Sequence, residues 1–218
     1  MSATVSEFRN ADSKPPVCGF LHRPAAPSAA GLVLTHGAGA NCQTPLLVAL
    51  ADAFCHAGFT VLRCDLPFRQ LRPHGPPHNS AEQDQAGLRT AVQSLRNLGL
   101  SRIFLGGHSY GGRQASMLAA SEPGLVEALL LLSYPLHPPR RPDQMRTQHF
   151  PRLQTPALFV SGTRDGFGSV DEMRAALALI PARTQILAVE SAGHELLKPA
   201  NRATLPPLIV EAFRAFIG

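Results

Sequence analysis

The sequence predicts an α/β fold, in which a mostly parallel, doubly wound sheet carries helices on both faces. From Gly31 onward, short apolar runs alternate with longer stretches whose apolar residues recur at helical spacing. The short runs do not alternate with polar residues, which is typical of strands buried on both faces. Turn residues such as Gly58 and Gly99 separate the two kinds of segment. Strands that alternate with helices in this way indicate a parallel sheet.

Six clear strands are expected in this alternation, with one or two weaker strands before them. The six lie at residues 31–35, 59–63, 102–105, 127–133, 157–161 and 185–189. The first helix begins at Pro45, with Thr44 as its N-cap, and ends at Gly58. Further helices are expected at 82–98, 113–120, 170–179 and 206–217. Proline-rich sequence predicts irregular segments at 69–80 and 134–152.

The length and composition predict a single domain over residues 1–218, because 218 residues of which 44% are hydrophobic can form one core. Only 16% of the residues are charged, so the composition does not favour disorder. Residues 1–16 are polar and lack a clear pattern, and we expect a flexible or weakly ordered segment there. Residues 17–21 form a short apolar run that could be an edge strand.

The composition also disfavours several classes of partner. The net charge is +5, but the arginines are spread along the chain and Trp is absent, whereas nucleic-acid surfaces usually combine a basic stripe with aromatic residues. We therefore expect no nucleic-acid partner, and the sequence leaves the oligomeric state open. No apolar run reaches the roughly 18 residues of a membrane helix, so no membrane partner is expected.

The cysteines and the N-terminal sequence bear on cofactors and location. No zinc spacing is formed by the four cysteines, Cys18, Cys42, Cys55 and Cys64, and we expect no metal and no cofactor. Residues 1–16 lack the apolar core of a secretory signal. The sequence therefore predicts a cytoplasmic protein.

Residues 107–111 read Gly-His-Ser-Tyr-Gly, between an apolar strand and a helix. This G-x-S-x-G pattern, in a strand–turn–helix context, is typical of a nucleophile elbow, where small flanking residues permit a sharp turn that exposes the serine hydroxyl. A phosphate-binding glycine loop would need G-x-G-x-x-G or a Walker lysine, and neither is present here. Ser109 is therefore the candidate nucleophile.

Two further residues with acid–base chemistry follow later strands. Asp165 comes shortly after the strand at 157–161, and His194 follows the last strand. Serine, then aspartate, then histidine is one known chain order of a catalytic triad. Asp171 and Glu172 are the alternative carboxylates, although acids at the start of a helix are explained by the helix dipole.

The segment after the strand at 31–35 supplies candidate oxyanion donors. The backbone N–H groups of Gly37 and Ala38 could bind an oxyanion together with the N–H of Tyr110, the residue after the candidate nucleophile. Because ligands bind at the carboxyl ends of strands in such sheets, we expect these groups to converge with Asp165 and His194 at one edge.

Over nearly all of residues 30–218, the chain resembles the α/β-hydrolase superfamily, and in particular the small lidless group related to dienelactone hydrolases. A closer resemblance, to the testis-expressed/NSL-complex-subunit-like hydrolase group, is carried by residues 34–40, 65–68, 133–139 and 162–165. The resemblance implies an α/β-hydrolase fold with no large lid, with Ser109 as nucleophile, His194 as base and Asp165 as its orienting carboxylate. Dienelactone hydrolases carry a cysteine where this chain has Ser109, which argues against dienelactone chemistry.

The sequence thus predicts a serine hydrolase that acts on small or medium esters, thioesters or related acyl substrates through an acyl-enzyme. The expected partner is a small-molecule acyl substrate. A non-catalytic protein-interaction module on the same fold is the alternative, because fold does not imply function. Residues 134–152 form the largest surplus segment, which we expect to line the rim of the site rather than form a lid, with its arginines favouring acidic substrates.

Overall fold

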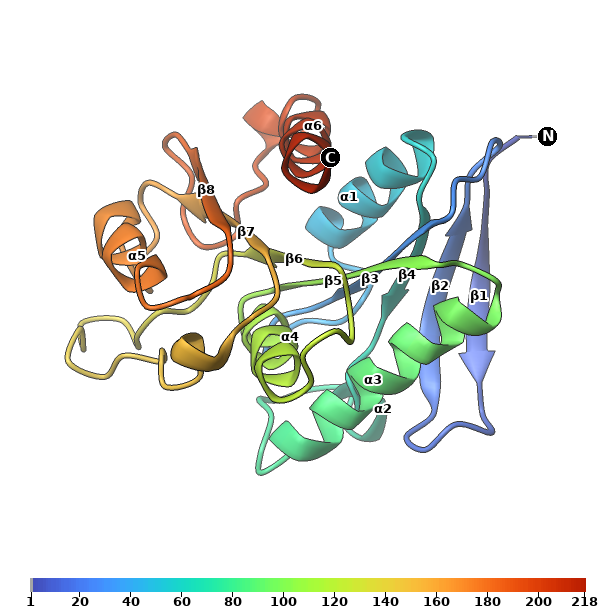
Figure 1. Cartoon of the computed structure of the whole chain (residues 1–218), viewed down its shortest axis with the longest axis horizontal. Helices are drawn as coiled ribbons and strands as arrows, with labels where there is room; N and C mark the ends of the chain where they lie inside the picture. The colour runs from blue at the N-terminus through green and yellow to red at the C-terminus, as the bar shows by residue number, and fades with distance from the viewer. Residues whose placement is uncertain (1) are drawn as a thin grey trace.

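The computed structural model describes residues 2–218, which contain an eight-stranded sheet (Figure 1). The strand order is β1-β2-β4-β3-β5-β6-β7-β8. β2 pairs antiparallel with both β1 and β4, and every pair from β4 to β8 is parallel. The strands are β1 Thr4–Asn10, β2 Val17–Arg23, β3 Ala30–Thr35, β4 Thr60–Cys64, β5 Arg102–His108, β6 Ala128–Leu132, β7 Ala157–Gly162 and β8 Thr184–Val189.

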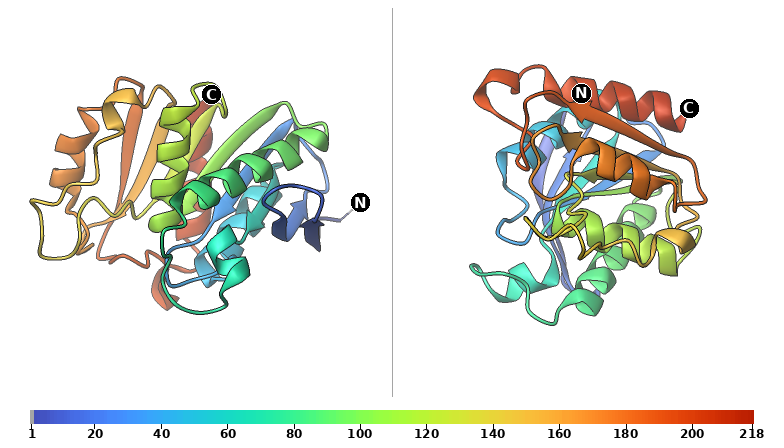
Figure 2. Two further views of the ribbon diagram at one scale, coloured as in Figure 1. Left: turned by 90° about the horizontal axis from the view of Figure 1, so that it is seen from below. Right: turned by 90° about the vertical axis from the view of Figure 1, so that its left-hand side faces the viewer.

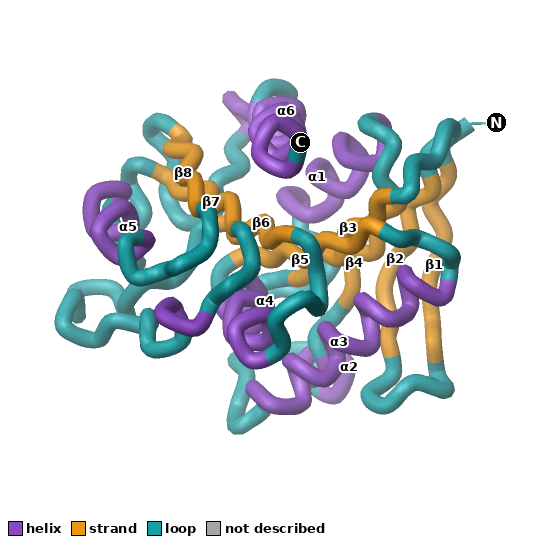
Figure 3. The backbone as a smooth tube through the Cα atoms, viewed as in Figure 1, coloured by secondary structure: helices purple, strands orange, loops and turns teal. Residues whose placement is uncertain are grey.

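Helices cover both faces of this sheet, as expected for a doubly wound fold (Figures 2 and 3). α1 and α6 pack on one face, and α2 to α5 pack on the other. The helices are α1 Pro45–His56, α2 Pro67–Leu71, α3 Ala81–Asn97, α4 Tyr110–Ser121, α5 Val170–Leu177 and α6 Leu205–Ile217, with 3-10 turns at Phe150–Arg152 and Pro199–Asn201.

The central strands are buried along their whole length, which explains their continuous apolar sequence. Every residue of β3, β4, β6 and β7 is buried. On the α1/α6 face, the Phe213 ring meets Phe54 and Phe104 edge-on at centroid distances of 5.7 and 5.4 Å. The opposite core is built from α3, α4 and α5 and includes Leu88 and Leu118. The six parallel strands expected from the sequence are confirmed.

The N-terminal segment differs from the expectation. Residues 4–10 form β1, whereas residues 1–16 were expected to be flexible or weakly ordered, and Met1 lies outside the described residues. β1 pairs with β2 from Thr4 opposite Arg23 to Asn10 opposite Val17. Most side chains of β1 are exposed, so the strand is held by backbone hydrogen bonds and carries no apolar pattern. Because β1 covers it, β2 is not the edge strand expected at residues 17–21.

Two helix boundaries also differ from the sequence prediction. α2 extends to Leu71, so the irregular segment expected at 69–80 begins later. Pro67 occupies the first turn of α2, where proline is tolerated, and Phe68 anchors the helix in the core. α4 begins at Tyr110 rather than at Arg113, directly after the candidate nucleophile.

The sheet brings the candidate segments to one edge. Thr35 at the end of β3 pairs with Gly107 near the end of β5, and Gly162 at the end of β7 pairs with Val189 at the end of β8. The loops that follow these four strands therefore leave the sheet on the same side. Between residues 2 and 218, no helix has both the length and the apolar character needed to cross a membrane.

Candidate active site

Ser109 occupies a sharp turn between β5 and α4. Its φ is +51° and its ψ is −116°, a backbone conformation that is rare for a residue with a side chain. Its N–H donates to the Leu132 carbonyl at 2.8 Å, which fixes the turn against β6. A Cβ added to Gly107 would lie 2.6 Å from the Gly111 carbonyl carbon, and one on Gly111 would lie 2.5 Å from the His36 carbonyl oxygen. This close approach explains both glycines of the motif.

His194 links Ser109 to Asp165. The Nδ1–H of His194 donates to both carboxylate oxygens of Asp165, at 3.0 and 2.9 Å. Because a carboxylate accepts, this bond places the proton on Nδ1 and leaves Nε2 to accept from the Ser109 hydroxyl, at 2.8 Å. The Asp165 side chain is only 2% exposed, and its Oδ1 also accepts from the N–H of Phe167 at 2.9 Å. A buried carboxylate thus orients the imidazole toward the serine.

The alternative carboxylates serve helix α5 instead. The Asp171 side chain is 91% exposed and pairs with Arg174 at 2.9 Å. Glu172 accepts from the N–H and the hydroxyl of Ser169 in a capping box, and these hydrogen bonds lower the pKa of Glu172. Of the three carboxylates considered from the sequence, the structure brings Asp165 to His194.

Residues 37–40 form a tight turn beside the serine, which we call the 37–40 turn. The N–H of Ala40 donates to the Gly37 carbonyl at 3.2 Å, and the Nδ1–H of His36 donates to the same oxygen at 2.8 Å. A Cβ added to Gly37 would lie 3.5 Å from the Cβ of Ser109. The turn therefore lies against the serine, and the Gly37 carbonyl accepts from His36 and Ala40.

Backbone N–H groups beside Ser109 are left without a protein acceptor. Those of Gly37, Ala38 and Tyr110, the three candidate oxyanion donors, donate to no protein acceptor among residues 2–218. The Ala38 N–H lies on the opposite side of its trans peptide from the Gly37 carbonyl. The first N–H of α4 also carries the positive end of the helix dipole. The N–H groups of Ala38 and Tyr110 are therefore able to donate to an anionic oxygen.

His36 is held as a neutral ring. Its Nδ1–H donates to Gly37, and its Nε2 accepts from the N–H of Leu66 at 3.1 Å. Burial lowers the pKa of His36, which favours the neutral form that can both donate and accept. The ring thereby connects the 37–40 turn to the chain that follows β4.

A cavity of about 560 Å³ opens at Ser109. Its lining consists of Gly37, Ala38, Gly39, Ala40, Thr44, Pro45, Leu46, His108, Ser109, Phe167, His194, Glu195 and Leu197. No residue of the segment 134–152 belongs to this lining, so the arginines expected at the rim do not reach it. The segment instead contacts a residue of the lining, because the His137 N–H donates to the Phe167 carbonyl at 3.0 Å. Glu195 is the only carboxylate among the lining residues.

Residues 28–207 match the family described as the alpha/beta hydrolase domain. The chain belongs to the α/β-hydrolase family. Its fold is similar to that of dienelactone hydrolase from Anabaena variabilis, with a TM-score of 0.79, 20% identity and 99% of each chain covered. Est1E from Butyrivibrio proteoclasticus is also similar, with a TM-score of 0.74, 16% identity and 97% of this chain and 98% of that one covered.

A curated relative adds sequence similarity. A Haemophilus influenzae protein described as a candidate esterase/lipase is 32% identical over 102 residues of this α/β-hydrolase. The match spans 46% of this chain and 33% of the relative, so this chain covers about a third of that protein. The family match and this partial similarity both relate the chain to α/β-hydrolases.

Sequence reasoning missed three residues that support the site of this α/β-hydrolase. The Nε2–H of His108 donates to the His194 carbonyl at 2.9 Å, and burial lowers the pKa of His108. The Phe167 ring lies against the His194 ring at a centroid distance of 4.2 Å. Arg69 binds carbonyls of the 37–40 turn. The position of His108 next to Ser109 was a usable signal, whereas Phe167 and Arg69 lie in loop and helix sequence without one.

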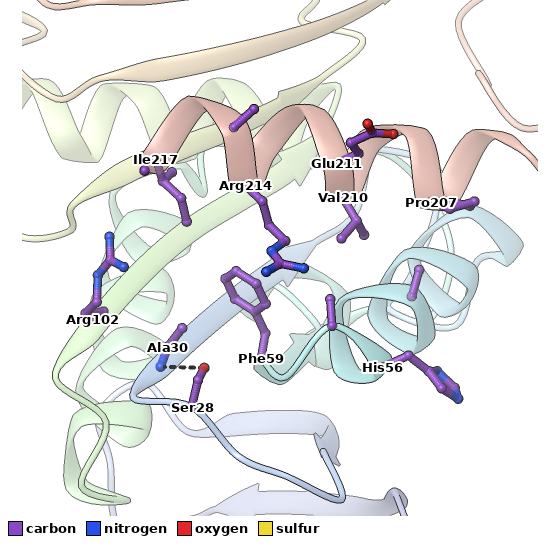
Figure 4. A pocket seen from close by; sticks show the side chains of 14 residues that line it. Ser28, Ala30, His56, Phe59, Arg102, Pro207, Val210, Glu211, Arg214 and Ile217 are labelled. Atoms are coloured by element: carbon purple, nitrogen blue, oxygen red, sulfur yellow. Dashed lines mark hydrogen bonds between the residues drawn. The ribbon is translucent and has the colours of Figure 1, made fainter.

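A cavity larger than the one at Ser109 lies elsewhere in this α/β-hydrolase (Figure 4). It measures about 820 Å³ and lies between α1, α6 and the start of β3, at the opposite edge of the sheet from the carboxyl ends. Its charged residues Arg102, Glu211 and Arg214 come from separate elements, and Arg102 pairs with Glu127. This cavity is therefore larger than the one at Ser109 but lacks a group of reactive side chains that are hydrogen-bonded to one another. Among residues 2–218, no group of three or more His, Cys, Asp or Glu side chains could hold a metal ion.

Proposed function

We propose that this protein is a serine hydrolase that cleaves small or medium esters, or related acyl compounds such as thioesters, through an acyl-enzyme. One observation carries the proposal: the unbroken hydrogen-bond chain from the Ser109 hydroxyl through His194 to the buried carboxylate of Asp165. Such a chain is the arrangement that a serine nucleophile needs, because free serine is a weak nucleophile.

The reaction would proceed by acyl transfer. His194 Nε2 takes the Ser109 proton as the serine oxygen attacks the ester carbonyl. The resulting oxyanion is bound by the N–H groups of Ala38 and Tyr110, while Asp165 stabilises the protonated imidazole. His194 then gives its proton to the leaving alkoxide, the C–O bond breaks and the alcohol departs. Water repeats the sequence on the acyl-enzyme, and the acid is released with Ser109 regenerated.

The shape and lining of the cavity support small or medium uncharged acyl groups. Pro45, Leu46, Phe167 and Leu197 give the cavity apolar walls, and Glu195 disfavours an anionic group beside the ester. The sequence-based expectation that arginines of the segment 134–152 favour acidic substrates is therefore not retained, because none of them lines the cavity. We also propose membership of the testis-expressed/NSL-like group on the motifs quoted above, and a small-molecule acyl substrate as the partner.

Hydrolysis of p-nitrophenyl acetate and butyrate tests this function. The wild-type chain should release p-nitrophenol, whereas Ser109→Ala should fall to the background rate. Ser101→Ala is the control, because Ser101 is exposed at the opposite end of β5. Equal rates for wild type and Ser109→Ala would favour the alternative, a protein-interaction module without catalysis.

A further inference from the structure

We infer that Arg69 is a positioning residue that holds the oxyanion-binding turn in its working shape. This inference rests on the proposed function, because it assigns to Arg69 the placement of the Ala38 N–H toward the reacting oxygen. Arg69 is the third residue of α2, and its hydrogen bonds go to backbone carbonyls and not to Ser109, His194 or Asp165.

All the hydrogen bonds of the Arg69 guanidinium go to backbone carbonyls. Its Nε–H donates to the Ala40 carbonyl at 2.7 Å, and an Nη2–H donates to the Ala38 carbonyl at 2.9 Å. On its other side it donates to the carbonyls of Arg72 at 3.0 Å and Gly75 at 3.0 Å. One side chain therefore ties the 37–40 turn to the proline-rich loop that begins after α2.

The chemistry of this contact requires arginine. Four carbonyls in different directions need a planar, forked group with several N–H donors, and a lysine ammonium has only three donors at one point. Arg69 is 6% exposed, and among residues 2–218 no carboxylate lies within ion-pair distance of it. A buried charge without an ion pair is costly unless it is fully hydrogen-bonded. The carbonyls of the turn and loop are therefore its essential partners.

The two carbonyls that Arg69 binds determine where the turn can point its N–H groups. His36 and Ala40 already hold the Gly37 carbonyl from one side, which directs the Ala38 N–H to the other. Arg69 fixes the next peptide of the turn through the Ala38 carbonyl. With the carbonyls on both sides of Ala38 hydrogen-bonded, the peptide that carries its N–H is held in one orientation. This is the preorganisation that oxyanion binding depends on.

α2 supports both candidate donors at once. The Arg69 guanidinium lies over the Phe68 ring, 4.9 Å from its centroid. The same ring packs against His36 at 5.6 Å and edge-on against Tyr110 at 5.7 Å. The Tyr110 hydroxyl donates to buried Asp84 at 2.7 Å, whose other oxygen accepts from the Phe68 N–H at 3.1 Å. α2 thus connects the Ala38 side and the Tyr110 side of the oxyanion site.

Arg63 supplies a matched control. It is also 6% exposed, and it also donates to a backbone carbonyl, that of Cys42 at 2.8 Å. Its remaining contacts are with His22 and with the Phe20 ring, 4.3 Å from the guanidinium, and it binds no carbonyl of the 37–40 turn. Arg63→Met therefore removes a comparable buried guanidinium without releasing the turn.

The experiment compares Arg69→Met, Arg69→Lys and Arg63→Met with the wild type. We would measure kcat and KM on p-nitrophenyl butyrate, the affinity for a trifluoromethyl ketone that forms a tetrahedral adduct, and deuterium exchange of peptides covering residues 36–45. Arg69→Met should lose about 10- to 100-fold in kcat with KM little changed, since one oxyanion donor is worth about 10²–10³. Affinity for the ketone should fall in parallel, and exchange should rise in the 37–40 turn. The kcat of Arg69→Lys should lie between those of wild type and Arg69→Met, and Arg69→Lys provides the test if Arg69→Met folds poorly. Arg63→Met should keep wild-type kcat, ketone affinity and turn exchange.

Deuterium exchange separates this inference from the proposed function. If the wild type were inactive, the proposed function would fail. Faster exchange confined to the turn in Arg69→Met would still support the inference that Arg69 holds the 37–40 turn in place. Unchanged exchange in the turn of folded Arg69→Met or Arg69→Lys would overturn it. Equal losses of kcat in Arg69→Met and Arg63→Met would also overturn it, because the effect would then be general destabilisation.

Discussion

Asp165 and Asp171 lie six positions apart in the sequence, and their surroundings assign them different tasks. Asp165 is buried in the turn after β7 and accepts from His194 and Phe167. Asp171 stands in solvent on the first turn of α5. A carboxylate can hold an imidazole in one tautomer only when its own position is fixed, and burial with a backbone donor provides that for Asp165.

Asp165→Asn should therefore lower turnover by about 10⁴, because an amide can no longer enforce the His194 tautomer. Asp171→Asn is the matched control and should leave turnover unchanged. Both rates are measured on p-nitrophenyl butyrate after confirming equal far-UV spectra. A larger loss for Asp171→Asn than for Asp165→Asn would show that the carboxylate has been assigned wrongly.

A second prediction at this scale concerns the glycine after the nucleophile. A Cβ on Gly111 would lie 2.5 Å from the His36 carbonyl oxygen and 2.6 Å from the Thr35 Cγ2, whereas one on Gly39 would meet nothing within 4 Å. Gly111→Ala should lower the free energy of unfolding by about 1–3 kcal/mol, as overpacking does. Gly39→Ala should change it little. Urea denaturation measures both, and equal stability of the two variants would contradict the close packing of α4 on the strand ends.

Sequence reasoning singled out Ser109, Asp165 and His194 because each follows a strand and belongs to a recognisable order, and the structure joins their side chains by hydrogen bonds. It also grouped Gly37, Ala38 and Tyr110 as candidate oxyanion donors, from their positions relative to Ser109. It could not identify Arg69, because the role of this arginine depends on which backbone carbonyls the fold brings within hydrogen-bond distance of its guanidinium. No residue pattern in the chain records that the loop after α2 lies beside the 37–40 turn.

Among the strands, those that the sequence predicted carry apolar runs, and β3, β4, β6 and β7 are buried along their whole length while β8 is partly exposed. β1 escaped detection because its partners are backbone groups of β2, and a polar strand at the sheet edge leaves no hydrophobic period. α2 escaped because five residues are too few for a helical pattern, and the prolines that follow it suggested a loop. In both elements the local sequence pattern is weak, and contacts with the rest of the fold determine the secondary structure.

The segment 134–152 packs against α4 through His149, which makes its packing sensitive to acid. His149 is 6% exposed, and its Nε2–H donates to the Ser116 hydroxyl at 2.8 Å. Burial, followed by the charges of Arg113 and Arg152, lowers the pKa of His149 to about 4. Unfolded histidine binds a proton near pH 6.5, so the unfolded state gains protons first as the pH falls. Stability present above pH 6.5 is then lost as the pH falls toward 4.

The free energy of unfolding should therefore fall by about 2.5 kcal/mol through His149 alone between about pH 7.5 and pH 4.5. His149→Gln removes this titration, so the stability difference between wild type and variant should shrink by that amount over the same range. Urea unfolding at both pH values measures it. A difference that stays constant with pH would show that His149 is not held neutral.

At the scale of the whole molecule, the cavity at Ser109 has no cover. Its walls come from the 37–40 turn, the start of α1 and the loops that carry Phe167 and His194. The largest surplus segment, 134–152, packs behind Phe167 and does not line the cavity. Long acyl chains would therefore extend into water, where the roughly 0.8 kcal/mol per buried CH₂ is not gained.

Catalytic efficiency should accordingly peak at short acyl chains. Among p-nitrophenyl acetate, butyrate, octanoate and decanoate, kcat/KM should be highest for the first two, without activation by emulsified substrate. Soluble and emulsified assays at one pH measure this. A steady rise toward decanoate would mean that an apolar cover forms when substrate binds.

The proposed reaction requires Ser109 to be a nucleophile that is activated by His194 and Asp165. Intact-mass analysis after treatment with a fluorophosphonate probe, followed by peptide mapping, tests it most directly. We expect one adduct per chain, located on Ser109 and absent from Ser109→Ala, with strongly slowed labelling in His194→Ala. Labelling that persists in Ser109→Ala, or a wild-type chain that takes up no probe while folded, would contradict it.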